Sequence, residues 1–285
     1  MEWDKFLPIV VEAGHNEEGQ QIIPMSFSFE ALYVDKEKYG LEDWNRSMSW
    51  REMRESDNVA LQFATSTCTT NFVGRVMEPG ADEPMFTEEE LLGYIRDYGG
   101  RLPNKPEYYD ELHEDDTAYS GAMMRASLPN QNISSEMPDM FVMGDGSPDY
   151  RIIPARNVKG GVTANINEFA AVNRNARYPY LAFKMIDLLM STANQQNSSL
   201  FNSRVILGMP VHMDIGSKEL PIEIYWYMSE ANFKEYCAAR DEITEVRFIG
   251  PVDKAINDII TVPAENVEKS VHEQYMLIKM LLAES

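Results

Sequence analysis

The sequence predicts an α/β fold, and three features carry that prediction. Residues 26–29 alternate polar and aromatic side chains, as a half-buried strand does. A second strand candidate at 162–169 is followed by a helical pattern at 180–195. The chain ends in three amphipathic patterns of helical period, at about 229–240, 250–260 and 264–283. Both kinds of element therefore recur along the chain.

The N-terminal part of the sequence predicts a short helix or turn, then a loop, then one extended strand. Residues 3–13 are apolar enough for a short helix or turn that ends near Gly14, and a polar loop follows to Gln21. The strand signal begins at residues 22–24 and continues beyond the alternating stretch through 31–34.

Two helix starts carry the spacing of a capping box. In this arrangement a Ser or Thr side chain caps the helix, and a Glu three residues later bonds back to the capping residue. Ser49 with Glu52 is one such pair, and Thr87 with Glu90 is the other. After the second pair, apolar residues keep a helical period as far as Gly99-Gly100, where a helix would end.

The second half of the chain predicts loops first and regular elements later. Residues 100–160 are rich in Pro, Asn, Asp, Gly and Met, which predicts loops with short strands. Pro179 can open the helix that runs to about 195, and a short strand or turn is expected at 205–211. One face of that helix carries Leu181, Met185, Leu188 and Leu189.

The charge of the chain excludes two classes of partner. Its 46 acidic and 25 basic residues give a formal net charge of −21. A surface this acidic repels phosphate backbones and anionic lipids, so we expect no nucleic-acid or membrane-surface role. No apolar run is long enough for a transmembrane helix, and the first residues do not have the pattern of a signal peptide.

Motifs that carry chemistry are missing from the sequence. Cys68 and Cys237 have no second cysteine or histidine at metal-ligand spacing, so no metal or cofactor site is expected. The spacings of nucleophile elbows, zinc proteases, P-loops and dinucleotide-binding loops do not occur. The Gly-x-Gly turn at 144–146 is interpreted as a β-turn. The sequence thus favours a protein that binds without reacting and is not an enzyme, and only the abundance of carboxylates supports a glycosidase.

Three segments resemble one known family. Residues 20–36 are similar to a stretch that reads Gly-Lys-x-Tyr-x-x-Pro, then an alternating strand, then Tyr-Asn-Lys. Residues 48–53 resemble a helix start of the form Thr-Trp-x-Glu-Leu, and residues 161–191 resemble a return strand, a Pro-containing turn and an Ala-x-x-Phe-x-x-x-Leu helix. In this order and spacing they resemble the extracytoplasmic solute-binding proteins of family 1, the sugar-type binding components of ABC importers. The resemblance continues through 208–211 to the C-terminal helices.

The resemblance implies a fold of the type II periplasmic-binding-protein class. Such a fold has two α/β lobes joined by hinge strands, here 26–32 and 162–169, and a hinge motion closes the lobes on a ligand. Family members carry an export signal and further strands before the segment that starts here, so we expect an N-terminally truncated chain with an incomplete lobe one. The expected segments are 1–27 (remnant of lobe one), 28–163 (lobe two), 164–212 (return to lobe one) and 213–285 (C-terminal helices of lobe two).

The resemblance also implies a binding site beside the hinge. Sugar sites combine aromatic faces, which stack on pyranose rings, with amides and carboxylates that bond hydroxyl groups. The expected ligand-binding residues are Phe27, Phe29, Asn71, Phe72, Asn165, Asn167, Met209 and Trp226. Structural alternatives stay open for several of them: strand core for both hinge phenylalanines, core for Trp226, and turn closure for the two asparagines of 162–169.

The implied function is capture of a carbohydrate, most simply an oligosaccharide, for an importer. Its expected partners are that solute and the ABC permease subunits in the membrane, and its expected location is extracytoplasmic, as a surface lipoprotein or in the periplasm. The alternative is a scaffold or interaction protein of the same fold that has lost ligand binding. Self-association of the truncated chain through lobe one is expected in addition, because open sheet edges and uncovered apolar faces recruit other chains.

Overall fold

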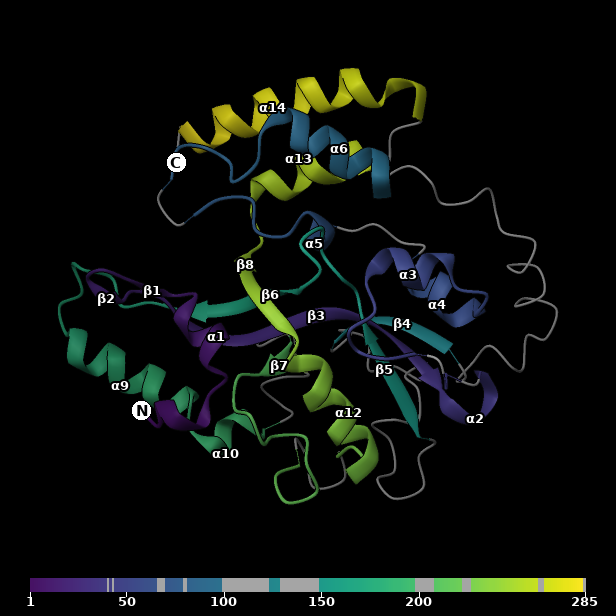
Figure 1. The fold of residues 1–285 in the computed structure, drawn as a ribbon. Helices are drawn as coiled ribbons and strands as arrows, with labels where there is room; N and C mark the ends of the chain where they lie inside the picture. Colours follow the sequence, from purple (N-terminus) through teal and green to yellow (C-terminus); the bar gives the residue numbers. More distant parts are fainter. Residues whose placement is uncertain are drawn as a thin grey trace.

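The computed structural model (Figure 1) describes ten parts of the chain. They are residues 1–39, 41–42, 44–65, 70–78, 81–98, 123–128, 149–197, 208–221, 227–260 and 264–283. Within these parts, no helix is long and apolar enough to cross a membrane.

Both kinds of element are present, and their order follows the predicted alternation. The strands are β1 (His15–Asn16), β2 (Gly19–Gln20), β3 (Ile23–Asp35), β4 (Met123–Leu128), β5 (Tyr150–Pro154), β6 (Val162–Ala170), β7 (Met209–Pro210) and β8 (Ile243–Phe248). The α-helices are α1 (Pro8–Glu12), α2 (Lys36–Tyr39), α3 (Trp50–Glu55), α4 (Val59–Ala64), α5 (Thr70–Val73), α6 (Glu88–Tyr98), α9 (Pro179–Leu189), α10 (Thr192–Gln195), α12 (Glu230–Arg240), α13 (Pro251–Ile260) and α14 (Val267–Ala283). Two 3-10 turns, η1 (Trp3–Lys5) and η4 (Ala264–Asn266), precede α1 and α14.

The long strand β3 organises the sheet. Its first half pairs antiparallel with β6 and β7, and its second half pairs antiparallel with β4 and β5. Strand β8 adds to β6 in parallel, which gives the path β4-β3-β6-β8. Figure 1 shows β3 crossing the middle of the molecule, with α6, α13 and α14 on one side and α12 on the other. A single strand thus runs through both halves of the sheet, as a hinge-crossing strand does.

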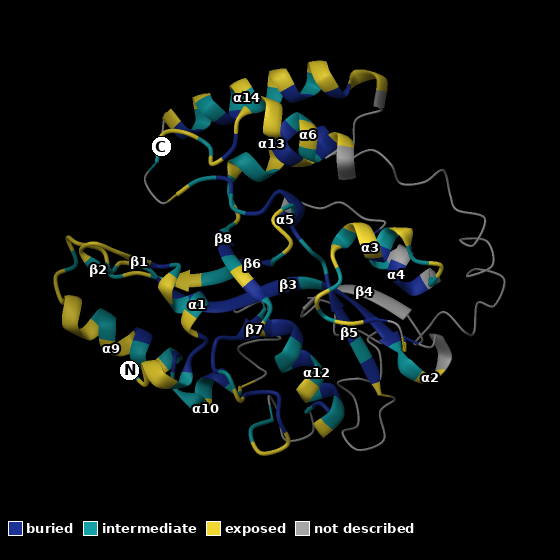
Figure 2. Cartoon of the chain, viewed as in Figure 1, coloured by how far each residue is buried: buried dark blue, intermediate teal, exposed yellow. Residues whose placement is uncertain are grey.

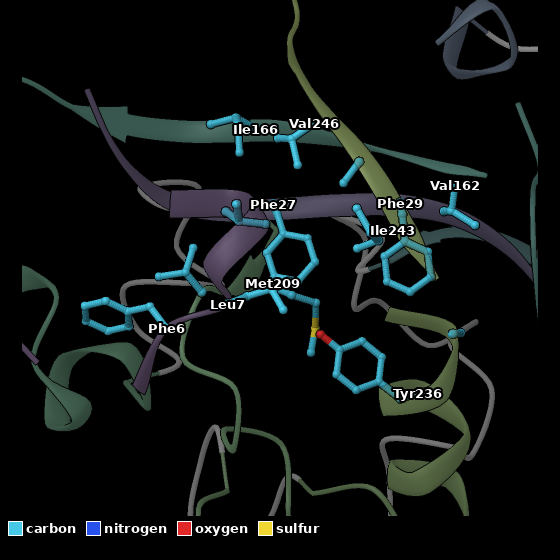
Figure 3. Packing of buried hydrophobic residues seen from close by; sticks show 14 of the residues in the cluster. Phe6, Leu7, Phe27, Phe29, Val162, Ile166, Met209, Tyr236, Ile243 and Val246 are labelled. Atoms are coloured by element: carbon cyan, nitrogen blue, oxygen red, sulfur yellow. The ribbon is translucent and has the colours of Figure 1, made fainter. Parts of the chain in front are cut away.

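The two faces of β3 differ in chemistry. Its odd-numbered residues from Phe27 to Tyr33 lie in the largest apolar cluster, which Figure 3 shows around Phe27, Phe29 and Tyr236 of α12. On the other face the strand begins with Ser26, Ser28 and Glu30 and only then becomes apolar. The burial colours of Figure 2 show the buried centre along β3 and β6. The first half of β3 therefore separates an apolar core from a polar layer.

Two smaller apolar clusters lie beyond the polar face. One is formed by α5, α6, α13 and α14, and includes Leu91, Ile95, Ile256 and Ile278. The other joins Leu32 and Val34 of β3 to residues of α3, α4 and β5. Both draw only on residues of the segments 28–163 and 213–285, whereas the largest cluster draws on all four expected segments. The proposed lobe two thus has apolar cores of its own.

The predicted capping boxes are confirmed. The Ser49 hydroxyl accepts a bond from Glu52 N at 3.2 Å, and Glu52 Oε2 accepts one from Ser49 N at 2.7 Å. At the start of α6 the corresponding Thr87–Glu90 distances are 3.1 and 2.7 Å. These bonds satisfy backbone donors that a helix start otherwise leaves unpaired, and they also hold the pKa values of the two glutamates below the usual range.

The structure differs from the sequence-based expectation at three places. Residues 15–20, expected to be a loop, form the short pair β1 and β2. Strand β8 had no counterpart in the prediction, because Glu245 and Arg247 interrupt its apolar pattern. In α9 the buried residue is Ile186, whereas Leu181, Met185 and Leu188 of the expected face are exposed to solvent. The reason is that α9 is apolar on more than one side, so its periodicity did not identify the inner face.

Candidate functional site

The polar layer over the central sheet gathers hydrogen-bonding side chains from three strands. Ser26 and Ser28 come from β3, and Thr163, Asn165 and Asn167 come from alternate positions of β6. In the sheet register Asn165 lies next to Ser28 on one side and next to Arg247 of β8 on the other. Alternation along a strand puts every second side chain on one face, so these residues form a continuous polar surface.

One end of this layer is internally satisfied. Glu245 Oε1 accepts bonds from Asn157 Nδ2 at 2.8 Å and Thr163 Oγ1 at 2.9 Å, and its second oxygen lies 3.3 Å from Lys159 Nζ. The backbone N–H of Arg75 also donates to Glu245, at 3.2 Å. A carboxylate with four donors around it has little capacity left for a ligand, so we assign this end a structural role.

Arg247 ties the sheet to the helices above it. Its side chain is buried, donates to Gly74 O at 3.2 Å and forms an ion pair with Asp253 of α13. Burial lowers the pKa of Arg247 to about 10, against the opposing effects of Glu245 and Glu30. The guanidinium therefore stays protonated at neutral pH and provides a fixed positive charge in the polar layer.

Other amides of the layer have no partner. Asn71 of α5 is buried, and neither Oδ1 nor Nδ2 has a hydrogen-bond partner; the same is true of Asn165 Oδ1. Helix α5 contacts β6, so both asparagines belong to the same layer. An unpaired buried polar group costs about 1–3 kcal/mol, so these groups are expected to be met by water or by a ligand.

Asn167 is positioned more tightly. Ser28 Oγ donates to Asn167 Oδ1 at 3.0 Å, and a Cβ on Gly208 would lie 2.6 Å from Asn167 Nδ2. Gly208 has a φ of +109°, a backbone conformation that favours glycine. The backbone of Gly208 therefore packs directly against the Asn167 amide.

Apolar side chains lie open to solvent at the end of this row. Phe169 follows Asn165 and Asn167 on β6, beyond a register shift in its pairing with β3, and 53% of its surface is exposed. It meets Phe248 edge-on, with ring centroids 5.5 Å apart. Ile249, just after β8, is 61% exposed. Accessible apolar surface next to fixed amides is the combination that sugar recognition uses.

The structure separates the residues predicted from sequence into two groups. Asn71, Asn165 and Asn167 lie in the polar layer. Phe27, Phe29 and Met209 lie in the largest apolar cluster on the opposite face, as Figure 3 shows, and Phe72 lies in the cluster of α6, α13 and α14. The side chains of these four are buried in apolar clusters, which favours the core alternative over ligand contact. Trp226 lies outside the described residues.

Sequence reasoning missed Phe169, Ser28 and Ile249. The signal for Phe169 was available, since it follows Asn165 and Asn167 at the same two-residue spacing. Ser28 was hidden by its aromatic neighbours, which drew attention to the other face of β3. Ile249 follows a strand that the sequence analysis did not identify.

Two features of the described residues bear on reactivity near this layer. Among the described residues no group of three or more His, Cys, Asp and Glu side chains could hold a metal ion. Cys237 lies on α12 beside Tyr236, which packs into the core on the apolar side of the sheet, and burial raises the pKa of its thiol. A raised thiol pKa disfavours the nucleophilic thiolate.

The sequence matches no protein-family model, and no curated protein matches it. Solved structures do. The extracellular solute-binding protein family 1 from Alicyclobacillus acidocaldarius aligns over 99% of this chain and 77% of its own, with 14% identity and a TM-score of 0.57. Maltose-bound MalE3 of T. maritima aligns over 98% and 77%, with 13% identity and a TM-score of 0.54. A de novo designed cysteine esterase aligns over 100% and 77%, with 10% identity and a TM-score of 0.54.

These neighbours share the architecture at very low identity. By their descriptions the first is a solute-binding protein, the second is maltose-bound, and the third is a designed enzyme. One architecture commonly carries unrelated functions. The structural similarity therefore shows the fold and does not show the activity. The chain has the fold of the extracellular solute-binding proteins of family 1.

Proposed function

We propose that this chain is the solute-binding component of an ABC importer and captures a carbohydrate without chemical conversion. The observation that carries the proposal is the row formed by Asn165, Asn167 and Phe169 along β6. It sets amide groups, one of which has an unpartnered oxygen, beside an exposed aromatic ring. Two of the structural neighbours support it, since one is a family 1 binding protein and the other was solved with maltose.

The proposed site lies between two lobes. Lobe one comprises 1–27 and 164–212, and lobe two comprises 28–163 and 213–285. The polar layer then faces the helices of lobe two, with Asn71 above the sheet and Ser28, Asn165 and Asn167 on it. The layer lies between the largest apolar cluster and the cluster of α5, α6, α13 and α14, and separating these two clusters would expose little apolar area. Trp226 is kept as a further proposed contact.

The proposed setting follows from this role. The protein would act outside the cytoplasm, as a lipoprotein or in the periplasm, and deliver its solute to permease subunits in the membrane. Neither step requires catalysis by this chain.

Ligand-dependent stabilisation tests the proposal. A panel of neutral and acidic oligosaccharides, with maltose and maltotriose included, is screened by thermal shift and then by isothermal titration. A ligand that binds only the folded protein raises the melting temperature with concentration. We expect Asn167→Ala and Phe169→Ala each to weaken binding about tenfold or more, through a lost hydrogen bond and a lost ring contact. Asn175→Ala and Tyr180→Ala, exposed and outside the row, are the matched controls.

A scaffold that has lost its ligand is the second candidate. It is favoured by the exposed apolar face of α9, which is a feature of an interaction surface. No saturable shift with any sugar, together with intact folding of the chain, would reject solute capture and favour this candidate.

A further inference from the structure

Two asparagines of the polar layer carry amide atoms that the protein does not pair. Asn71 and Asn165 are only 5% and 8% exposed. Both amide atoms of Asn71, Oδ1 and Nδ2, and the Oδ1 atom of Asn165 are buried without a hydrogen-bond partner. Helix α5, which carries Asn71, contacts β6 and lies above it in Figure 1. In the proposed division into lobes, the two amides therefore come from opposite sides of the layer.

The backbones that carry these two amides are fixed. The backbone carbonyl of Asn71 accepts a bond from Gly74 N at 3.1 Å. Asn165 lies inside β6, where its sheet neighbours are Ser28 of β3 and Arg247 of β8. An unpaired amide on a fixed backbone is a preformed contact, since little has to be ordered when a ligand binds.

The charged groups of the layer already have partners within the protein. Glu245 is surrounded by four donors, and Arg247 is paired with Asp253 and donates to Gly74 O. A carboxylate or ammonium group that entered the layer would lose its water and would find these three charges already engaged. The net charge of −21 adds long-range repulsion against anions. The layer is therefore suited to a group without charge.

The unpaired amide atoms select groups that both donate and accept hydrogen bonds. Asn71 offers one donor and one acceptor side by side on a planar amide, and Asn165 adds a second acceptor. A carboxylate only accepts, so it would leave both amide oxygens unpaired. An ammonium group only donates, so it would leave Asn71 Nδ2 unpaired. Neighbouring sugar hydroxyls, or an acetamido group, can do both.

We propose that Asn71 and Asn165 make the site selective for uncharged sugars, whose hydroxyl or acetamido groups meet the two amides. This selectivity rests on the proposed function, because the amide atoms are buried and a solute reaches them only when the two lobes separate. Sugars with a carboxylate or an amino group are excluded by the loss of hydration and by the amide atoms that they leave unmatched. The two asparagines are thus specificity-determining residues.

Isothermal titration of a trisaccharide panel tests the selectivity. Its uncharged members are maltotriose, cellotriose, galactotriose and triacetylchitotriose, and its charged members are trigalacturonate and deacetylated chitotriose. Uncharged members should bind alone, or at least about tenfold more tightly than the charged sugar of the same linkage. Their dissociation constants should change less than about twofold between about 0.05 and 0.5 M NaCl, because binding forms no charge pair.

Asn71→Asp tests the assignment to this residue. The change removes the donor and adds a negative charge at almost the same size. Uncharged sugars should therefore bind about tenfold or more weakly, and deacetylated chitotriose should gain affinity relative to the acetylated form. Asn71→Ser keeps a donor and an acceptor without charge and should keep the preference for uncharged sugars. Asn175→Asp, exposed in the turn before α9, is the matched control and should leave all affinities unchanged.

The outcomes separate this selectivity from the proposed function. A charged sugar that binds as tightly as its uncharged counterpart, or more tightly, overturns the selectivity and leaves solute capture standing. Failure of every sugar in the panel to bind overturns both. A folded Asn71→Asp variant that keeps the wild-type order of affinities also overturns the role of Asn71. Where that variant does not fold, Asn165→Asp gives the same comparison.

Discussion

Ser28 on β3 and Asn167 on β6 are joined by a 3.0 Å hydrogen bond from Ser28 Oγ to Asn167 Oδ1, although 139 residues separate them in the chain. The bond crosses the polar layer and leaves Asn167 Nδ2 beside the backbone of Gly208. A binding amide held on both sides needs little reordering when a solute arrives. Such preorganisation reduces the entropy lost on binding.

Gly208→Ala should disturb both stability and binding. The new Cβ would meet Asn167 Nδ2 at 2.6 Å and Phe27 O at 2.8 Å, at a φ of +109°. We expect the free energy of unfolding to fall by about 2–4 kcal/mol, from backbone strain and overpacking together. Gly160→Ala is the control, since its φ is also positive (+85°) and nothing lies within 4 Å of its Cβ site. The free energy of unfolding of the Gly160→Ala variant, measured in urea, should fall by only about 1–2 kcal/mol. Equal losses in the two variants would show that Gly208 does not pack against the site.

Asn71→Leu should stabilise the protein and weaken solute binding. Both amide atoms of Asn71 are buried without a partner, so a leucine of similar size removes an unpaired polar group. We expect the free energy of unfolding of the unliganded variant to be about 1 kcal/mol higher than that of the wild type. We expect its affinity for sugar to fall about tenfold.

Asn157→Leu is the matched opposite. This buried asparagine accepts bonds from Lys159 N and Gly161 N at 3.0 and 3.1 Å and donates to Thr163 and Glu245. Replacing Asn157 by leucine should lower the free energy of unfolding by about 2–4 kcal/mol, because those partners are left unpaired. If both leucine variants destabilise alike, Asn71 is a structural residue and not a site residue.

Local sequence rules predicted the positions of helices and strands better than they predicted which face of each is buried. The Ser49–Glu52 and Thr87–Glu90 spacings each produced a helix start, because a capping box depends on four consecutive residues only. Strand β8 could not be identified in this way. Glu245 and Arg247 have the sequence pattern of surface residues. Only the fold supplies the Asn157 and Thr163 groups that donate to Glu245 and the Asp253 carboxylate that pairs with Arg247.

The site was predicted in part for the same reason. Alternation showed that Phe27 and Phe29 share a face of β3, but the choice between core and site depends on what packs against that face. Tyr236 stacks on Phe29 with ring centroids 6.2 Å apart, and it comes from a helix more than 200 residues further along the chain. The asparagines were identified because a polar side chain in a buried strand needs a hydrogen-bond partner on whichever face of the strand it lies.

Glu235→Ala should loosen the edge of the sheet at β5. Glu235 of α12 lies 2.5 Å from Arg151, 2.8 Å from Arg46 and 3.6 Å from Lys36. Only 13% of its side chain is exposed, so removing it leaves three cations close together with less screening by water. We expect a loss of about 1–3 kcal/mol in unfolding free energy, smaller at high salt because screening weakens the repulsion.

Glu230→Ala on the same helix provides the comparison. Its partner Lys234 lies at 2.6 Å, but both side chains are mostly exposed, and exposed pairs contribute little. The Glu230 variant should unfold like the wild type. A Glu235 variant that also unfolds like the wild type would mean that the network around it adds nothing to stability.

His212 should make stability depend on pH. Its ring is buried, packs edge-on against Phe6 and has Nδ1 3.3 Å from the N–H of Asp214. Burial lowers the pKa of His212 below its usual 6.5, and Lys5 acts in the same direction, while Asp214 and Glu2 oppose the shift. Just below pH 6.5 the unfolded chain therefore binds a proton that the folded chain does not. Stability from this group is complete above pH 6.5 and is lost as the pH falls toward the folded pKa.

The variant His212→Gln removes this titration and keeps a polar side chain. At pH 7.5 it should be less stable than the wild type, because packing against Phe6 is lost. As the pH is lowered to 5.5, the wild type loses the advantage of its neutral histidine and the difference in unfolding free energy should shrink. The comparison is made by urea unfolding at several pH values, with His272→Gln on the exposed side of α14 as the control. A difference that stays constant from pH 7.5 to 5.5 would show that His212 does not couple folding to pH, since linkage requires the folded and unfolded pKa values to differ.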